Sequence, residues 1–316
     1  MAVSAGNVVA LAGGVGGAKL ALGLALALSP ERLTVVVNVG DDFEHHGLYI
    51  CPDLDTVMYT LAGLADPVKG WGIAGDTTAA LQMLGRYGAE TWFALGDQDL
   101  ATHLVRTRAL HAGARLTEVV GRMCRALGVA PCVLPVTDDR VATTVDTLRE
   151  GALSFQEYFV RRRWEPVVAG LRYEGAAAAA LTPEVSAALD AAALVVFCPS
   201  NPVLSIDPML AVDGLRARLA GVQARRVAVS PIVGGAALKG PAAKLMAEMG
   251  MEVSPVGVAA HYKDLLDGFV LDVRDAGLEP RVRALGMATL VTDTVMNARA
   301  DRLRLAETIL DWSKTL

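Results

Sequence analysis

The chain has 316 residues, of which 53% are hydrophobic, and a formal net charge of −5. This length is enough for one large domain or two interleaved domains with a sizeable buried core. The negative charge argues against nonspecific nucleic-acid binding, which needs a basic surface. The apolar run 20–28 is too short for a bilayer span of about 20 residues, and the first residues lack the basic start of a signal peptide. We therefore expect a cytoplasmic protein that binds neither nucleic acid nor membrane.

Cysteine usage agrees with that location. The chain has four cysteines, Cys51, Cys124, Cys132 and Cys198, and no two of them form a CxxC pair. A zinc site or a redox-active dithiol is therefore not expected. Cys132 and Cys198 lie in apolar, strand-like runs, so we predict that both are buried, reduced thiols.

Short apolar runs rich in β-branched residues alternate with helix-length segments along much of the chain. The runs predicted as strands are 8–11, 34–37, 132–135, 194–198, 226–229, 253–256, 269–271 and 289–291. Several are continuously apolar, which is typical of strands covered on both faces of a parallel sheet. Segments with helical spacing of apolar residues are 213–221, 240–250 and 301–312. This alternation predicts an α/β fold with a Rossmann-like, doubly wound, mostly parallel sheet.

The middle of the chain has a different pattern. Between about residues 41 and 183 helical patterns dominate, with fewer strand-like runs and more charge. We interpret this segment as a mainly helical insertion or smaller subdomain that covers the active site. Residues 1–40 and 184–316 then form the Rossmann-like core.

A glycine-rich segment follows the first predicted strand. Gly13, Gly14, Gly16 and Gly17 precede Lys19. Glycines let backbone amides approach a phosphate, the next helix adds the positive end of its dipole, and a lysine supplies charge. The segment is not a Walker A loop, which needs Ser or Thr after the lysine, nor a GxGxxG fingerprint, which needs glycine where Lys19 stands. A tight turn without a ligand remains an alternative.

Four aspartates lie near the end of the second predicted strand. Asp41 and Asp42 follow this strand directly, and Asp53 and Asp55 come shortly after. Asp55 is also placed to cap a helix over residues 56–64, but one cap does not explain four carboxylates. Carboxylate oxygens suit Mg²⁺, which takes one or two of them together with phosphate oxygens and water.

Two further loops follow predicted strands of the core, where open α/β sheets bind ligands. Their candidate binding residues are Pro199, Ser200, Asn201, Ser230 and Gly234. Lys239 comes shortly after and is either a ligand contact or a surface lysine. No Ser–His–Asp or Cys–His arrangement stands out, so covalent catalysis is not expected.

Seven segments together resemble one known family. They are LAGGVGGAKL (11–20), NVGDD (38–42), CPDLDTVMYTLAG (51–63), LGDQDLATHLVRT (95–107), TDDRVAT (137–143), PSNPVLSI (199–206) and SPIVGGAALKGPAAKLM (230–246). In this order, and over most of the chain, they resemble the 2-phospho-L-lactate transferase family of coenzyme F420 biosynthesis. The glycine segment alone would be too common to identify it.

The resemblance implies a reaction. A guanosine-diphosphate-activated donor gives its phospho-three-carbon-acid group, 2-phospholactate or phosphoenolpyruvate, to a hydroxyl of the deazaflavin Fo, and GMP leaves. A donor derived from 3-phosphoglycerate is an alternative. Mg²⁺ is the implied cofactor, and Fo and the guanylylated phospho-acid are the implied partners. The family fold is Rossmann-like with a smaller added region.

The resemblance also implies roles for individual residues. Asp55, Asp53 and Lys19 are the implied catalytic residues, and the two aspartates are the implied metal ligands. The residues implied to bind the donor and cofactor are Gly13, Gly14, Gly16, Gly17, Lys19, Asp42, Pro199, Ser200, Asn201, Ser230 and Gly234. Some archaeal relatives carry a basic residue where this chain has Ala94, so we expect Arg106 or Arg140 to supply the Fo contact.

Two other classes of function stay open. A dinucleotide-dependent oxidoreductase would use the glycine segment together with an acidic residue about 20 positions further on, and Asp41 stands near that place. A non-catalytic nucleotide-sensing protein, like the related gluconeogenesis-factor family, would share the glycine segment alone. A homodimer is expected because dimers are the commonest soluble oligomers.

Overall fold

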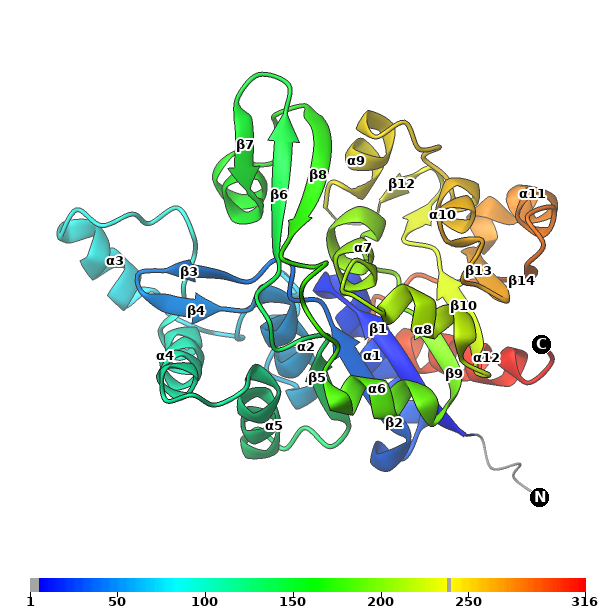
Figure 1. The fold of residues 1–316 in the computed structure, drawn as a ribbon, viewed down its shortest axis with the longest axis horizontal. Coiled ribbons are helices and arrows are strands. Elements are labelled where there is room, and N and C mark those ends of the chain that lie inside the picture. The colour runs from blue at the N-terminus through cyan, green and yellow to red at the C-terminus, as the bar shows by residue number, and fades with distance from the viewer. Residues whose placement is uncertain (1–5, 238–239) are drawn as a thin grey trace.

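The computed structural model describes residues 6–237 and 240–316, so Lys239 lies outside the described residues. Across them the core is a seven-stranded sheet whose neighbouring strands are all parallel (Figure 1). In sheet order its strands are β14 (Ala288–Thr292), β13 (Gly268–Asp272), β10 (Arg225–Val229), β9 (Ala192–Phe197), β1 (Asn7–Ala12), β2 (Leu33–Val37) and β5 (Cys132–Pro135). The central strands are buried on both faces, which is why they are continuously apolar in sequence.

Strand order reverses between β1 and β9. β2 and β5 lie on one side of β1, whereas β9, β10, β13 and β14 lie on the other. This is the predicted α/β class with a Rossmann-like, doubly wound sheet, and it is confirmed. Ligands of such folds bind outside the carboxyl ends of the strands at the reversal point.

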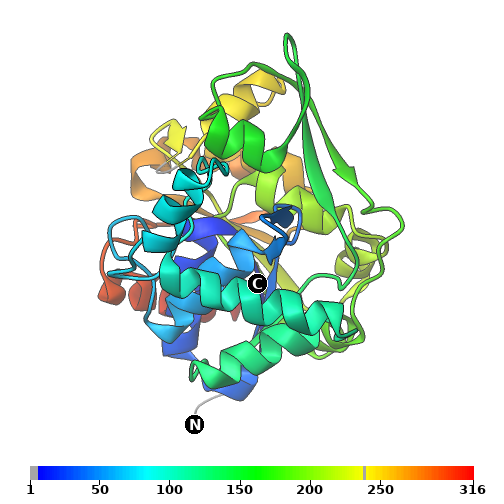
Figure 2. The same cartoon turned by 90° about the vertical axis from the view of Figure 1, so that its left-hand side faces the viewer.

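Helices cover both faces of the sheet (Figure 1, Figure 2). On one face α1 (Gly14–Ala27) packs against α2 (Pro52–Ala62) and α12 (Arg299–Ser313). The other face is covered by α6 (Pro183–Asp190) and α8 (Leu215–Gly221). The other α-helices are α3 (Ala79–Arg86), α4 (Asp97–His111), α5 (Leu116–Ala126), α7 (Asp207–Leu210), α9 (Ala242–Glu248), α10 (Pro255–Tyr262) and α11 (Glu279–Arg283).

The segment expected to be mainly helical, residues 41–183, also contains strands. β5 is an edge strand of the central sheet, with Leu134 paired to Val36 of β2. The segment's antiparallel strands are the hairpin β3 (Phe43–His45) and β4 (Leu48–Ile50), and the sheet formed by β6 (Ala142–Thr147), β7 (Gly151–Ser154) and β8 (Val168–Glu174). The core sheet therefore draws one strand from the expected insertion. The division of the chain into two domains stays a prediction.

Two local predictions are wrong. Residues 253–256 do not form a strand, because Ser254 caps α10 by accepting a hydrogen bond from the Gly257 amide (3.2 Å), and Pro255 is the first helical residue. Cys132, at the edge of the sheet, is exposed, whereas Cys198 is a buried free thiol as predicted.

Among the described residues, the helices are all too short or too polar to cross a bilayer. β11 (Ile232–Val233) and β12 (Ala236–Ala237) form a small hairpin after β10.

Candidate active site at the reversal point of the sheet

A cavity of about 730 Å³ opens at the carboxyl ends of the central strands. Its wall combines the segments that follow β1, β2, β9 and β10 with parts of α2, α4 and the segment after β7. The predicted site residues that line it are Gly13, Gly14, Gly16, Lys19, Asp53, Asp55, Pro199, Ser200, Asn201 and Ser230. Residues that are far apart in sequence thus converge on one cavity.

The glycine segment and the loop after β9 are locked together. The Gly13 amide donates to Ser200 Oγ (3.0 Å), and this hydroxyl donates back to the Gly13 carbonyl (2.9 Å). A Cβ at Gly16 would overlap the carbonyl oxygen of Pro199, and one at Gly17 would lie 2.6 Å from Ser200 Oγ. Close packing therefore requires several of the glycines whether or not a ligand binds.

The same segment presents backbone amides to the cavity. Gly14 has a positive φ of 59°, which glycine adopts without strain, and it begins α1. Its amide donates to Asp53 Oδ1 (2.7 Å), but the next two amides, of Val15 and Gly16, have no acceptor within the helix. Together with the helix dipole they form an anion-binding position. Lys19 lines this position, and its Nζ donates to the Met296 carbonyl (2.8 Å).

Three buried carboxylates, of Asp41, Asp42 and Asp53, form no ion pair with a described residue. Asn38 Nδ2 bridges two of them, donating to Asp41 Oδ1 (2.7 Å) and Asp53 Oδ2 (3.0 Å). Burial raises the pKa of Asp53 to about 6 and that of Asp41 well above its usual range, where Asp53 adds repulsion. Burial also raises the pKa of Asp42, and neither oxygen of this carboxylate accepts a well-aligned hydrogen bond from a described residue.

Asp55 is held differently, by a buried arginine. Arg106 Nη1 donates to Asp55 Oδ2 (3.0 Å), and Arg106 Nη2 donates to Asp55 Oδ1. Burial raises the pKa of Asp55, and Arg106 is the strongest of the groups that oppose this rise. Asp55 belongs to α2 and Arg106 to α4, and the two residues are 51 positions apart in the sequence.

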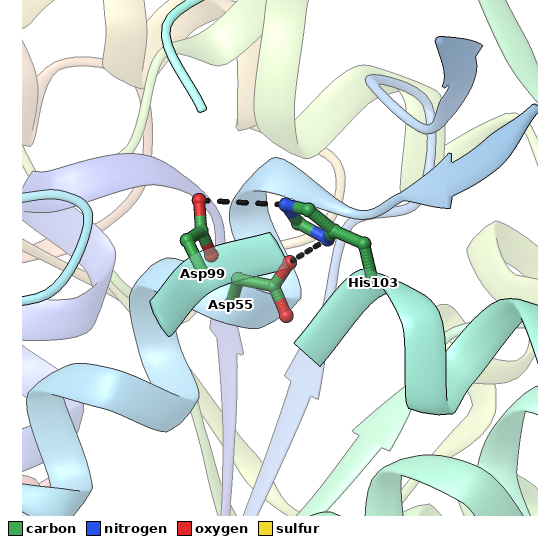
Figure 3. A group of neighbouring side chains, drawn as sticks. All are labelled: Asp55, Asp99 and His103. Carbon is green, nitrogen blue, oxygen red and sulfur yellow. Dashed lines mark ion pairs between the residues drawn. The ribbon is translucent and has the colours of Figure 1, made fainter. Parts of the chain in front are cut away.

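His103 lies between Asp55 and Asp99 (Figure 3). Its Nδ1 is 3.7 Å from Asp55 Oδ2 and 3.3 Å from Arg106 Nη1, and its Nε2 is 3.4 Å from Asp99 Oδ2. Because the guanidinium can only donate, Nδ1 faces it as the acceptor. The Tyr59 hydroxyl completes this network by donating to Asp99 (2.7 Å).

Two groups of acidic side chains, one of them with a histidine, are candidates for a cation site. Asp55, Asp99 and His103 have ligand atoms within 4.8 Å of one another, but Arg106 already neutralises Asp55. Asp41 and Asp53 line the cavity, carry raised pKa values and form no ion pair with a described residue. Their oxygen donors and their unbalanced charge fit Mg²⁺.

Some predicted residues lie outside the cavity wall. Gly17 packs under the loop after β9, and Asp42 is buried. Gly234 lies in the β11–β12 turn, where its amide donates to Asp275 Oδ2 (2.9 Å). Arg106 and Arg140 do not line the cavity either, so the structure does not place the expected Fo contacts there.

The expected helix cap at Asp55 is also wrong. α2 begins at Pro52 with Cys51 before it, so Asp55 is already inside the helix. A proline at the first helical position favours this earlier start. Asp53 and Asp55 therefore both belong to the first turn of α2, which fixes their backbones on a rigid element.

The aromatic part of the cavity lining is not predicted from the sequence. It is called the aromatic wall below and consists of Tyr59, Trp71, Phe93, Phe155, Phe159 and Trp164. The i,i+4 spacing of Asp99 and His103 on a helix is a signal that could have found those two residues. The aromatic residues follow no period and come from four separate segments, so no local pattern indicates them.

Fold and site define a doubly wound α/β protein with a cavity, lined by aromatic rings and buried carboxylates, at the reversal point of its sheet. The model of the 2-phospho-L-lactate transferase CofD family matches residues 8–307. The chain belongs to this family, and is a transferase by that membership.

Curated relatives match along almost the full length. The chain is 42% identical over 311 residues to a phosphoenolpyruvate transferase of Kitasatospora aureofaciens, with 95% of this chain and 97% of the relative covered. It is 38% identical over 302 residues to a 2-phospho-L-lactate transferase of Methanosarcina mazei, with 96% and 99% covered. A solved UPF0052 family protein of Bacillus halodurans shares the fold, with a TM-score of 0.65, 15% identity and coverage of 98% and 99%.

Proposed function

We propose that this transferase moves a phospho-three-carbon-acid group from a guanosine-diphosphate-activated donor to a hydroxyl of the deazaflavin Fo, in coenzyme F420 biosynthesis. A phosphorus–oxygen bond forms to the acceptor hydroxyl, the bond from that phosphorus to GMP breaks, and the hydroxyl proton is released. Family membership and the names of the two groups of relatives support this proposal.

One observation carries the proposal. The Gly14 amide lies 2.7 Å from Asp53 Oδ1, so the anion-binding start of α1 and the unbalanced carboxylates meet at one point of the cavity. A diphosphate and a divalent cation are the pair of ligands that would satisfy both at once. Phosphoryl transfer needs positioning and charge neutralisation above all, and this arrangement supplies both.

Each wall of the cavity then has a task. The amides of Val15 and Gly16, with Lys19, bind the donor phosphates. Asp53 and Asp41 would hold Mg²⁺, which would neutralise charge on the diphosphate. Asp55 accepts a hydrogen bond from the acceptor hydroxyl and orients it, because Arg106 favours its charged form.

The aromatic wall suits the acceptor. Rings bind planar heterocycles by stacking and exclude water from the reacting groups. The nucleotide then lies on the other side, along the loops that contain Ser200 and Ser230. The pairing of Ser200 with Gly13 keeps this loop next to the diphosphate position.

A direct assay tests the proposal. Purified protein is given Fo, Mg²⁺ and, in turn, the lactyl, enolpyruvyl and glyceryl guanosine diphosphates. We expect GMP release and a deazaflavin whose mass has grown by the phospho-acid with at least one donor. The Asp55→Asn variant, which keeps the shape of the side chain, should lose most of this activity. If the protein bound NADH and did not bind GDP, this result would instead favour an oxidoreductase. GDP binding without turnover or Fo binding would favour a nucleotide sensor.

A further inference from the structure

Three consecutive arginines lie between Phe159 and Trp164 of the aromatic wall, and they differ in their partners. Arg161 Nη1 pairs with Glu90 Oε1 (3.2 Å), and Arg162 Nη2 pairs with Glu150 Oε1 (2.6 Å). The Arg163 side chain forms no ion pair or hydrogen bond with a described residue, and it lines the cavity. Two of the three positive charges are thus neutralised outside the site, and the third faces it.

The backbone around Arg163 is unusual. Residues Glu157–Arg161 form a π-helical turn, a rare conformation that is frequent at functional sites. Arg163 and Trp164 follow it with φ of 49° and 50°, the left-handed region that non-glycine residues seldom occupy. The Trp164 amide holds the turn by donating to the Tyr158 carbonyl (2.9 Å). Such conformations persist where surrounding contacts fix them, and they occur often at ligand clamps.

The charges of the cavity show what Arg163 can bind. The acidic groups in its wall are Asp41, Asp53, Asp55 and Asp99. Among the described residues, Lys19, Lys69 and Arg163 are the lysines and arginines of the wall. Lys19 stands at the start of α1, and Lys69 lies over the ring of Trp71 (5.4 Å). Arg163 is therefore the arginine among the described residues of this wall. Its planar guanidinium can form two parallel hydrogen bonds to one carboxylate.

The donor of the proposed reaction carries two anionic parts. Its diphosphate fits the amides at the start of α1, but the carboxylate of its three-carbon acid would be repelled by the aspartates around Asp53. It needs a cation away from them. Arg163 meets this need, because it lines the same cavity and comes from the segment after β7, whereas the aspartates come from the segment after β2 and from α2 and α4.

We propose that Arg163 determines donor specificity by binding the carboxylate of the three-carbon acid. This inference rests on the proposed function, because that function supplies the carboxylated donor. It also gives a reason why Arg163, unlike Arg161 and Arg162, has no acidic partner among the described residues. Discrimination between carboxylated and neutral donors then resides in the segment after β7, not in the nucleotide loops.

A comparison of two ligands and two variants tests it. The ligands are lactyl-2-diphospho-5′-guanosine and the isopropyl ester of GDP, in which a methyl group replaces the carboxylate. The variants are Arg163→Gln and the matched control Arg162→Gln, whose arginine pairs with Glu150 outside the cavity. Dissociation constants are measured by calorimetry with Mg²⁺ and without Fo, and melting temperatures report folding. Arg163→Lys is measured as the variant that keeps the charge but loses the fork.

We expect the wild type and Arg162→Gln to bind the lactyl ligand about 10- to 100-fold more tightly than the isopropyl ligand, the range for a charge-assisted bidentate pair. Arg163→Gln should bind both alike and keep its affinity for GDP, and Arg163→Lys should fall between. An unchanged preference for the lactyl ligand in Arg163→Gln overturns the inference. Absence of GDP binding by the wild type instead refutes the proposed function.

Discussion

At the scale of single residues, the site is defined by which carboxylates have a cation and which do not. Asp55 is neutralised by Arg106, whereas Asp41 and Asp53 share the Asn38 amide and no cation among the described residues. An unbalanced buried carboxylate is costly, so natural sites that keep one usually bind a charge there. Because of this difference, we propose different tasks for the two predicted metal ligands, Asp53 and Asp55.

Asp53→Asn should separate activity from stability. We expect turnover to fall by about 100-fold or more, because the cation loses a ligand. The pKa of Asp53 is about 6 in the folded protein, above its usual 3.8. The folded state therefore binds this proton more tightly, and the wild type loses stability as pH rises from about 4 to 6. Urea unfolding of both proteins across this range, without Mg²⁺, should show the variant gaining relative stability as pH rises. A constant difference would contradict the assignment.

Arg106→Ala should destabilise the protein strongly. It leaves Asp55 buried and unpaired, a change that typically costs about 3–5 kcal/mol. Arg162→Ala is the matched control, since it breaks an exposed ion pair worth about 0–1 kcal/mol. Chemical denaturation measures both. Equal, small losses would show that Asp55 does not depend on Arg106.

At the scale of elements, the start of α1 depends on the loop after β9. Gly16 is placed where any side chain would meet the Pro199 carbonyl, and Ser200 binds both the amide and the carbonyl of Gly13. The loop after β9 and the start of α1 therefore form one structural unit. Disturbing either should change ligand binding before it changes the fold.

Gly16→Ala tests this unit. The added methyl group should displace the loop of Pro199 and Ser200 and weaken GDP binding by about 10-fold or more, an effect of overpacking. Gly121→Ala is the control, because it adds a methyl group inside α5 with only ordinary contacts, and replacing a helical glycine stabilises by about 0.5–1 kcal/mol. Calorimetric titration with GDP distinguishes them. Full affinity in Gly16→Ala would contradict the coupling.

The elements that sequence predicts well are those with a local signal. Continuous apolar runs predict the strands of the sheet, and glycines and aspartates after them indicate the site. Residues 253–256 show the limit of this signal, because the Ser–Pro pair that starts α10 overrides an apolar run. The Asp55–Arg106 pair and the position of Arg163 depend on contacts between distant segments, so no spacing in the sequence predicts them.

At the scale of the whole molecule, the cavity is lined by segments from the Rossmann-like core and from residues 41–183. The doubly wound sheet brings the ends of β1 and β9 together, and the segments after β4 and β7 close the cavity with the acidic and aromatic walls. The class of the sheet could be predicted from the sequence. The parts of residues 41–183 that reach the cavity could not be predicted. The edge strand β5 belongs to this segment and pairs with β2 of the core, so the two parts of the chain share one sheet.

A crystal structure of the protein with GDP and Mn²⁺, in which anomalous scattering locates the metal, tests the proposed positions of the nucleotide and the cation. We predict phosphate oxygens within hydrogen-bond distance of the Val15 and Gly16 amides, and Mn²⁺ bound to Asp53. Nucleotide bound away from the start of α1, or Mn²⁺ held by Asp55, Asp99 and His103 instead, would contradict it.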